Sequence, residues 1–494
     1  MTTFTRLVDL ASERFGGRAI AANDDFFAPK ENLVKRSAAI FIPDKYTDRG
    51  KWMDGWETRR RRTPGHDWCI VQLGLAGVLR SIVVDTAFFR GNFPSHCSLE
   101  ACSAPAATSV EELTSEHTVW TPVLGRSELE GDTQNTFEVG NAQRVTHVRL
   151  NIYPDGGVAR LRVMGEVVPD WETIFEKQEE IDVASIVHGG YVADVSDRFF
   201  GEPHNMLMPD RAANMGDGWE TKRRRGPGHD WAVVRLGVES TIRRVEVDTA
   251  HFKGNYPDRC SIEASADGCG WKVLLRETKL NPDRLHVYES ELADVGPASE
   301  LRLNIYPDGG ISRFRALGVP TPAGRQRTLL RVFNVMDVRE ARTALQDCCG
   351  APRWVDRMLD RRPFESIEHL FAVSADTLGK LSAEEWLEAL HHHPRIGEKA
   401  AERPQSMRAA RWSAKEQSAA ATASASDFAE LASLNQEYER RFGFVFLVCA
   451  TGRTLHEITA ALRQRLTHDP ETELRVAADE HRRITRIRLE KLLT

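Results

Sequence analysis

The chain is 494 residues long, with 41% hydrophobic and 28% charged residues, a length and composition typical of a globular protein with about three domains. Its 66 basic and 72 acidic side chains give a net charge of −6, too balanced to indicate nucleic acid or a membrane surface as a partner. No apolar run reaches membrane-spanning length, the first residues lack the order of a secretory signal, and the eight cysteines form no CxxC pair. We therefore expect a cytoplasmic protein with free thiols that lie mostly in the core.

A long internal repeat organises the first 325 residues. Three blocks occur twice: DGWETRRRRTPGHDW (54–68) returns at 217–231, VDTAFFRGNFPSHCSLEAC (84–102) at 247–265, and RLNIYPDGGVARLRVMG (149–165) at 302–318. Each copy is the size of one domain and too long for a solenoid repeat. No block recurs beyond residue 328, so the sequence predicts two similar domains and one unrelated domain.

Each copy reads as a set of strands. The segments WCIVQLG, RSIVVDTAFF and HVRLNIY, and their counterparts in the second copy, are short, rich in Val and Ile, and separated by Gly, Pro, Asp or Asn. YPDGG (153–157 and 306–310) predicts a turn between two strands. Several short strands with turn-rich connections predict an antiparallel β-sandwich in each copy.

A polar string precedes the first of these strands. Both copies keep a glutamate, three arginines, a histidine and an aspartate there. In a structural interpretation the arginines are solvated and Asp67 and Asp230 bridge to them. In a functional interpretation the guanidinium groups grip a small carboxylate, with a histidine and an acid nearby for proton transfer. DNA binding is a third, weaker interpretation, because acidic residues are interleaved and the chain is net acidic.

The repeated strings GWETRRRR..GHDW, VDTA.F.GN.P and RLN.YPDGG resemble the allantoicase family over about residues 17–322. The resemblance implies two jelly-roll sandwiches of the galactose-binding-like kind, at 17–180 and 181–322, that hydrolyse allantoate to (S)-ureidoglycolate and urea. Allantoate needs a cation for its carboxylate, polar partners for two ureido arms, and a proton donor for departing urea. The candidate residues are Glu57, Arg60, His66, Asp67, Asp85 and Asn92 in the first copy, and Glu220, Arg223, His229, Asp230, Asp248, His251 and Asn255 in the second.

Several alternatives stay open for these candidates. Asp85 and Asp248 also suit a turn at a strand end, and Asn92 and Asn255, each next to glycine, also suit a turn. The copies differ where Phe88 stands against His251, so one copy could be catalytic and the other structural. A divalent metal is compatible with the chemistry, but no ligand pattern demands one.

Residues 328–494 predict helices, with 319–327 as a linker of two prolines and a glycine. Ser382 with Glu385, and Thr454 with Glu457, are spaced as capping boxes at helix starts. The segment 427–442 carries an apolar face that includes Leu431 and Tyr438. The run FVFLVCA (444–450) is short, apolar and preceded by glycine, and by local pattern alone it predicts a strand.

The strings HPRIGEK, SAKEQ and LNQEYERRFGFVFLVCATGRT, in this order, resemble the decarboxylases of 2-oxo-4-hydroxy-4-carboxy-5-ureidoimidazoline (OHCU). The resemblance covers the whole tail and implies an all-α bundle that needs no cofactor and forms (S)-allantoin. Carried over residue by residue, it makes His393 the proton donor. It implies that the substrate is lined by Pro394, Ser413, Ala414, Lys415, Glu416, Gln417, Phe446, Leu447, Val448, Cys449 and Ala450, with Asn435 and Arg441 in support.

Without the resemblance, some of these residues have ordinary structural explanations. Ser413 and Glu416 fit a capping box, and Arg441 suits a solvated cation at a helix end. One departure from the family string is Val445, where the family has proline, and this frees one backbone torsion beside the substrate.

The two resemblances together predict a bifunctional enzyme of purine degradation that takes allantoate and OHCU as small-molecule substrates and assembles as a homo-oligomer. The alternative is that the sandwiches only bind a ligand and the tail is the only enzyme. Release of urea from allantoate distinguishes the two.

Overall fold

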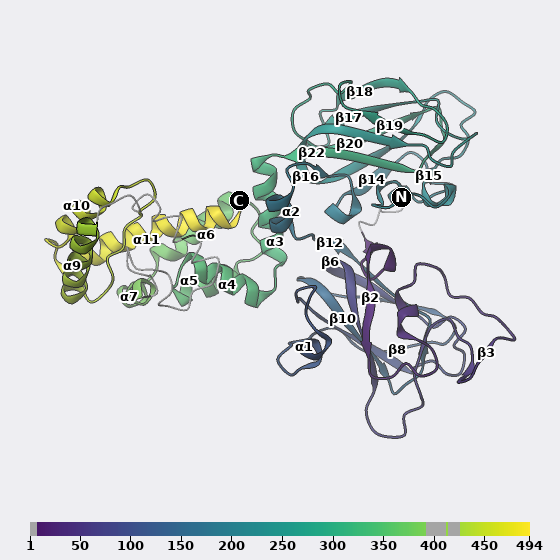
Figure 1. Ribbon diagram of the computed structural model, residues 1–494, viewed down its shortest axis with the longest axis horizontal. Coiled ribbons are helices and arrows are strands. Elements are labelled where there is room, and N and C mark those ends of the chain that lie inside the picture. The colour runs from purple at the N-terminus through teal and green to yellow at the C-terminus, as the bar shows by residue number, and fades with distance from the viewer. Residues whose placement is uncertain (1–6, 392–411, 413–424) are drawn as a thin grey trace. The chain divides into compact units, whose positions relative to one another are not determined.

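The structure is a computed structural model that describes residues 7–391, 412 and 425–494. It divides into two compact units, Met1–Arg325 and Gln326–Thr494. Strands dominate the first unit and helices the second, as the sequence predicts (Figure 1). The first unit contains two β-domains with the same order of strands, one for each copy of the repeat.

The longest strand of the first β-domain, β6 (Asp67–Asp85), takes part in two groups of strands. Its first residues pair with β10 and β2, and its last residues pair with β12 and β9. The strands of this domain are β1 (Val8–Asp9), β2 (Arg18–Ala22), β3 (Tyr46–Thr47), β4 (Gly50–Lys51), β5 (Trp56–Glu57), β6, β7 (His96–Cys102), β8 (Thr121–Glu128), β9 (Gln134–Glu138), β10 (Arg144–Tyr153), β11 (Gly157–Val158) and β12 (Arg160–Val167), with one short helix, α1 (Val110–Thr114).

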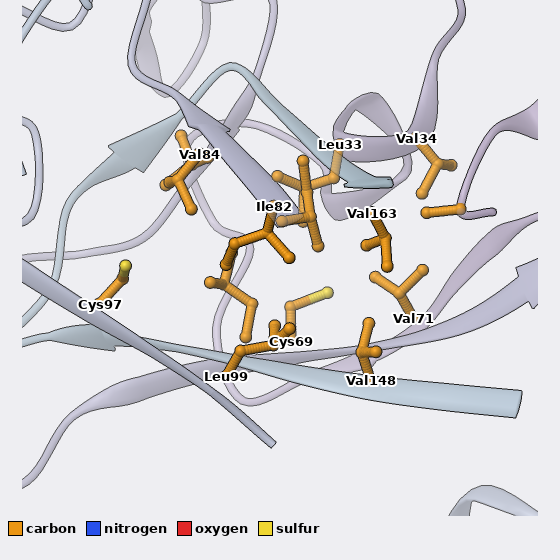
Figure 2. Packing of buried hydrophobic residues seen from close by; sticks show 14 of the residues in the cluster. Leu33, Val34, Cys69, Val71, Ile82, Val84, Cys97, Leu99, Val148 and Val163 are labelled. Atoms are coloured by element: carbon orange, nitrogen blue, oxygen red, sulfur yellow. The ribbon is translucent and has the colours of Figure 1, made fainter. Parts of the chain in front are cut away.

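The side chains of the two groups meet in one core. Cys69, Val71 and Val148 come from the β2–β6–β10 group, and Ile82 and Val163 come from the β12–β6–β9 group; all five are completely buried in one cluster (Figure 2). Burying apolar surface on both inner faces stabilises a two-layered domain.

The sequence suggested two separate strands where β6 runs without a break, and this prediction is wrong. The chain passes from one group to the other at Gly74, which lies against the backbone of the preceding loop. A Cβ at Gly74 would lie 2.6 Å from the nitrogen of Gly17, and one at Gly237, its equivalent, 1.8 Å from the carbonyl oxygen of His188. Glycine therefore permits a close backbone approach here rather than ending the strand.

The second β-domain repeats this arrangement around β16 (Asp230–Asp248). Its elements are β13 (Ile181–Asp182), β14 (Tyr191–Val195), β15 (Trp219–Glu220), β16, β17 (Arg259–Ser265), β18 (Lys272–Lys279), β19 (Leu285–Tyr288), β20 (Ala298–Tyr306), β21 (Gly310–Ile311) and β22 (Arg313–Pro320), preceded by the short helix α2 (Trp171–Lys177).

Both ends of the long strand lie at the same end of each domain. Asp67 at the start of β6 is opposite Ile152, and Asp85 at its end is opposite Arg160. Only residues 153–159, which begin with the predicted YPDGG turn, separate those two partners, so the two aspartates are brought toward one edge. The register repeats in the second domain, where Asp230 is opposite Ile305 and Asp248 is opposite Arg313.

The second unit is helical. Its helices are α3 (Pro322–Val335), α4 (Val338–Cys348), α5 (Pro352–Asp360), α6 (Ile367–Gly379), α7 (Ala383–His391), α9 (Ala425–Phe442), α10 (Leu455–Arg465) and α11 (Pro470–Leu492). Both predicted capping boxes are present: Ser382 and Glu385 exchange backbone hydrogen bonds at 2.7 and 3.2 Å, and Thr454 caps α10 with Glu457.

Two predictions for the tail are wrong. The segment 319–327 contains the boundary between the two units, but it is not an irregular linker, because Val319 and Pro320 belong to β22 and Pro322 begins α3, where the missing N–H of proline costs nothing. The run 444–450 forms neither strand nor helix. It is nearly all buried among helices, and side chains bind its backbone: Arg465 donates to the carbonyl of Leu447 at 2.6 Å, and Glu480 accepts from the N–H of Cys449 at 2.8 Å.

Candidate functional site

Three loops of each β-domain converge at the end where the long strand starts and finishes. In the first domain Glu57 on β5 is opposite Gly157 on β11, and the N–H of Gly157 donates to the carbonyl of Asn92 at 2.8 Å. The backbone N–H of Arg61 donates to Asp155 in the YPDGG turn at 2.8 Å. The polar string, the loop after β6 and the turn after β10 thus form one site, called the polar end below.

A half-buried glutamate lies in each polar end. Asn92 donates to Glu57 at 2.7 Å, and Asn255 donates to Glu220 at 2.5 Å. Burial raises the pKa of Glu57, and the hydrogen bond from Asn92 only partly offsets that rise. Since Asn92 and Asn255 hold these glutamates, their role is larger than that of turn residues.

The aspartate at the start of the long strand is held by an arginine of the same string. Arg61 is 2.6 Å from Asp67, which is 2% exposed, and Arg224 is 2.5 Å from Asp230. Asn23 also donates to Asp67 at 2.9 Å, and Ser196 donates to Asp230 at 3.0 Å. For these two acids the structural interpretation holds, because their charge is already balanced. One oxygen of Asp67 is nonetheless buried without a partner among the described residues.

The histidines of the polar string lie against the tyrosine that precedes the turn. The ring centroids of His66 and Tyr153 are 4.8 Å apart, and those of His229 and Tyr306 are 4.6 Å apart. Nε2 of His229 is 3.3 Å from Oδ1 of Asn304, a buried side chain on β20. Each histidine is therefore positioned by a neighbouring ring and is half-buried.

The other arginines of the string face solvent. Arg60 and Arg223, and Arg62 and Arg225 beside them, are exposed, and within the described ranges no ion pair involves any of the four. Arg60 and Arg223 thus remain available as cations for a small anion.

Asp85 and Asp248 act in part as turn residues. One oxygen of Asp85 accepts from the N–H of Ala87, and one oxygen of Asp248 from the N–H of Ala250, both at 2.8 Å. The residue after each turn, Phe88 or His251, has a positive φ near 70°. His251 also bonds through Nε2 to the carbonyl of Ala212 at 2.9 Å, so it is anchored to the loop before the polar string.

Arg160 and Arg313, which follow the second turn in sequence, are already paired and are not available as cations for a substrate. Arg160 is 1% exposed, and its guanidinium is 2.7 Å from Asp54 and donates to the carbonyls of Ser37 and Asp54. Burial acts to raise the pKa of Asp54, but the hydrogen bonds from Arg160 and from the N–H of Ile40, with the charges of Arg160 and Lys35, together hold it below its usual value. Arg313 is bound in the same way to Asp217. Sequence reasoning missed both aspartates, although each opens the repeated DGWET string.

Among the described residues, no group of three His, Cys, Asp or Glu side chains is arranged to hold a metal ion. All eight cysteines are free, and six of them are buried, as the composition predicted. No helix in the part of the chain that the structure describes is long and apolar enough to cross a membrane.

In the helical unit, several predicted substrate residues lie outside the described residues: His393, Pro394, Ser413, Ala414, Lys415, Glu416 and Gln417. The second predicted segment is described. Phe446, Leu447, Val448 and Ala450 are buried in the helical core, and Cys449 alone is half-buried. Asn435 is buried on α9, and Arg441 donates to the carbonyl of His468 at 2.9 Å, which fixes the loop before α11.

A buried polar network contacts the backbone of the 444–450 segment. No motif in the sequence indicated this network. Glu473 is completely buried and accepts hydrogen bonds from Tyr438 and, at 2.7 Å, from Arg465. Nδ1 of His468 lies 2.8 Å from the second oxygen of Glu473. Burial raises the pKa of the Tyr438 hydroxyl, so it stays a donor. Because Arg465 also holds the carbonyl of Leu447, this network fixes the shape of the segment.

The family model of the allantoicase repeat matches residues 8–168 and again 181–321. The chain belongs to the allantoicase family. The model of OHCU decarboxylase matches residues 334–490, so the helical unit is a domain of that second family. Both families that the sequence motifs indicated are confirmed.

Relatives of the β-domains come from bacteria and eukaryotes. A protein named "Probable allantoicase 1" from Burkholderia mallei is 48% identical over 324 residues, which cover 63% of this chain and 94% of that protein. "Allantoicase" from Dictyostelium discoideum is 45% identical over 318 residues, which cover 62% of this chain and 85% of that protein. The crystal structure of allantoicase from Saccharomyces cerevisiae has a TM-score of 0.54 and 36% identity, and covers 64% of this chain and 94% of that one.

Proposed function

We propose that the chain is a bifunctional enzyme of purine catabolism. Its β-domains hydrolyse allantoate to (S)-ureidoglycolate and urea, and its helical unit decarboxylates OHCU to (S)-allantoin. The observation that carries this function is the presence of two complete allantoicase repeats and one OHCU decarboxylase domain in a single chain. The relatives match the repeats over most of their own length, which disfavours a ligand-binding module without chemistry.

The polar end supplies the groups that allantoate hydrolysis requires. The substrate carries one carboxylate and two ureido arms on one carbon. Exposed Arg60 and Arg223 supply cations for the carboxylate, and Asn92 and Asn255 supply amide groups. Each polar end also holds a half-buried glutamate bound by an asparagine, Glu57 in the first copy and Glu220 in the second, and such a carboxyl suits protonation of the departing urea nitrogen.

The decarboxylase step needs no cofactor in this proposal, because the imidazoline ring accepts the electron pair left behind by carbon dioxide. His393 then delivers a proton to one face of that carbon, which fixes the S isomer. The wall formed by Phe446 to Ala450 excludes water, and Arg465 holds its backbone.

We further propose that each β-domain is a jelly roll and that the chain works in the cytoplasm as a homo-oligomer. A divalent metal is compatible with allantoate hydrolysis, and the chelator test below decides whether the reaction needs one. The long strand shared by two facing groups supports the jelly roll. Allantoin must be opened to allantoate between the two reactions, so direct channelling between the sites is not expected, and the fusion serves joint expression.

The test is urea release from allantoate by the purified chain, with and without a chelator, beside carbon dioxide release from OHCU. Saturable urea release supports the allantoicase half, and its loss with chelator supports the metal. Folded protein that releases carbon dioxide but no urea under either condition contradicts the allantoicase half.

A further inference from the structure

A cavity of about 350 Å³ lies on the second β-domain, away from its apolar core. Three neighbouring strands provide its floor: Asp248 on β16 is opposite Leu285 on β19 and Arg313 on β22, and Glu246 is opposite Arg315. Side chains alternate along a strand, and the intervening Val247 and Phe314 are completely buried in the core. The charged residues therefore lie on the opposite face, where Arg211 and Asp283 complete the wall.

The charges of this cavity are only partly balanced from within. Arg313 is bound to Asp217, and Arg315 is 3.2 Å from Asp182. Arg211 is exposed, and among the described residues it has no ion pair or hydrogen bond. Glu246 has one distant partner, Arg244 at 3.5 Å. The cavity thus presents one available guanidinium beside carboxylate oxygens, which suits a small ligand with both an acid group and several N–H donors.

The first copy lacks this cavity's chemistry. Nε of Arg160 donates to the carbonyl of Ser37, and Nε of Arg313 donates to the carbonyl of Asp210, so Ser37 and Asp210 are equivalent. The residues that follow them, Ala38 and Arg211, are therefore equivalent too. On the strand floor Val83 stands opposite Arg162 where Glu246 stands opposite Arg315. The first copy has a longer loop before its polar string, and from that loop Phe41 stacks on Phe88 at 5.6 Å. The first copy therefore keeps the other charged positions of this face but has Ala38 and Val83 where the second copy has Arg211 and Glu246.

The first β-domain also reaches across to support the cavity wall. Arg14 lies 2.8 Å from Asp210 and 3.0 Å from Asp217, and Arg36 lies 2.6 Å from Asp217. Asp210 directly precedes Arg211, so these contacts fix the segment that carries the available guanidinium.

We propose that the second β-domain is the substrate-binding copy. In this proposal Arg211, which lines the cavity, binds the carboxylate of the ureido acid in place of Arg223, which does not line it, and Glu246 and Asp248 accept hydrogen bonds from a ureido arm. Asp248 ends β16, and the loop that follows it carries Asn255, which binds Glu220 in the polar end. The assignment of allantoate as this ligand rests on the proposed function, whereas the ligand class rests on the cavity itself.

The experiment uses the full chain and two probes, with the substitutions chosen from the first copy. Arg211→Ala and Glu246→Val install the residues found at the equivalent positions, Ala38 and Val83. Arg243→Ala is the matched control, because Arg243 is an exposed arginine on the same strand outside the cavity. One probe is allantoate, followed by urea release; the other is N-carbamoylglycine, a stable ureido acid, followed by calorimetric titration, with acetate as the acid without a ureido arm.

Arg211→Ala should raise KM for allantoate about tenfold or more, with kcat changed much less, since it removes one charge-assisted bond to the carboxylate. N-carbamoylglycine should bind the wild-type chain more tightly than acetate does, and should lose a similar factor in Arg211→Ala and Glu246→Val but not in Arg243→Ala. Melting temperatures near that of wild type exclude misfolding as the cause.

Each negative outcome identifies what is wrong. Urea release with wild-type kinetics in both cavity variants overturns the binding copy while leaving allantoicase activity in place. Binding of N-carbamoylglycine through Arg211 without any urea from allantoate contradicts the proposed function and leaves the ureido-acid site standing. No binding of N-carbamoylglycine by the wild-type chain overturns the site.

Discussion

Replacing the buried Arg160 with alanine should be among the most damaging single changes in the first β-domain. The side chain is 1% exposed, its guanidinium donates at 2.7 to 2.9 Å to Asp54 and to the carbonyls of Ser37, Asp54 and Ala159, and Asp54 itself is 7% exposed. Alanine leaves that carboxylate with Lys35, at 3.4 Å, and the backbone N–H of Ile40, at 3.1 Å, and it removes the guanidinium donor from three carbonyls. Breaking one partner from a buried ion pair costs about 3–5 kcal/mol in the free energy of unfolding.

The measurement is urea unfolding of the full chain, followed by tryptophan fluorescence, against a matched control on the same strand. Arg162→Ala removes a cation two residues away whose side chain is 21% exposed and which is 3.3 Å from Asp9. Such a partly exposed pair should cost about 1 kcal/mol or less. If Arg160→Ala destabilises the chain no more than Arg162→Ala does, the argument from burial is refuted.

Three further changes test other parts of the structure. Burial raises the pKa of Glu57, so the carboxyl binds a proton more tightly in the folded chain than in the unfolded chain. The protonated Glu57 therefore contributes to the free energy of unfolding at low pH. This contribution is lost as the pH rises from about 4.5, the ordinary value, through the folded pKa. Glu57→Gln should abolish that decline in pH-dependent unfolding, and a decline that persists in the variant would exclude Glu57 as its source. Tyr438→Phe removes a buried hydrogen bond to Glu473 and should cost about 1.5–3 kcal/mol in thermal unfolding of the helical unit; no loss would mean that the network does not stabilise it. His393→Asn should stop carbon dioxide release and leave urea release unchanged, and a parallel loss of both would contradict two independent sites.

Local sequence pattern predicted the class of each unit because repetition and periodicity report directly on strands and helices. It could not predict that β6 and β16 each run unbroken through two groups of strands. Gly74 reads as the end of a strand, and only the backbone of Gly17, distant in sequence, shows why a glycine stands there. The prediction of a strand at 444–450 was wrong for a related reason. A strand needs a partner strand, and here the side chains of Arg465 and Glu480 bind the backbone instead.

The sequence likewise predicted one part of the candidate site and not another. The repeated DGWET string correctly marked Glu57 and the arginines as one polar cluster, because both copies keep it. The string did not tell which arginines are already paired: Arg61 binds Asp67, whereas Arg60 remains exposed. The repeat could not predict the cavity in the second copy, because Arg211 and Glu246 differ from their equivalents in the first copy and the repeated strings contain only what the copies share.

The contact between the two β-domains has a direction. Arg14 and Arg36 of the first copy reach the buried carboxylates of the second. The second copy lacks both arginines. Val187 stands in place of Arg14, two residues after the serine that precedes the short helix, and Pro209 stands in place of Arg36, two residues after the end of the next one. A head-to-tail contact that every copy could make would allow an open-ended array. Here the array ends at two, since the second copy lacks the two arginines that would make the next contact.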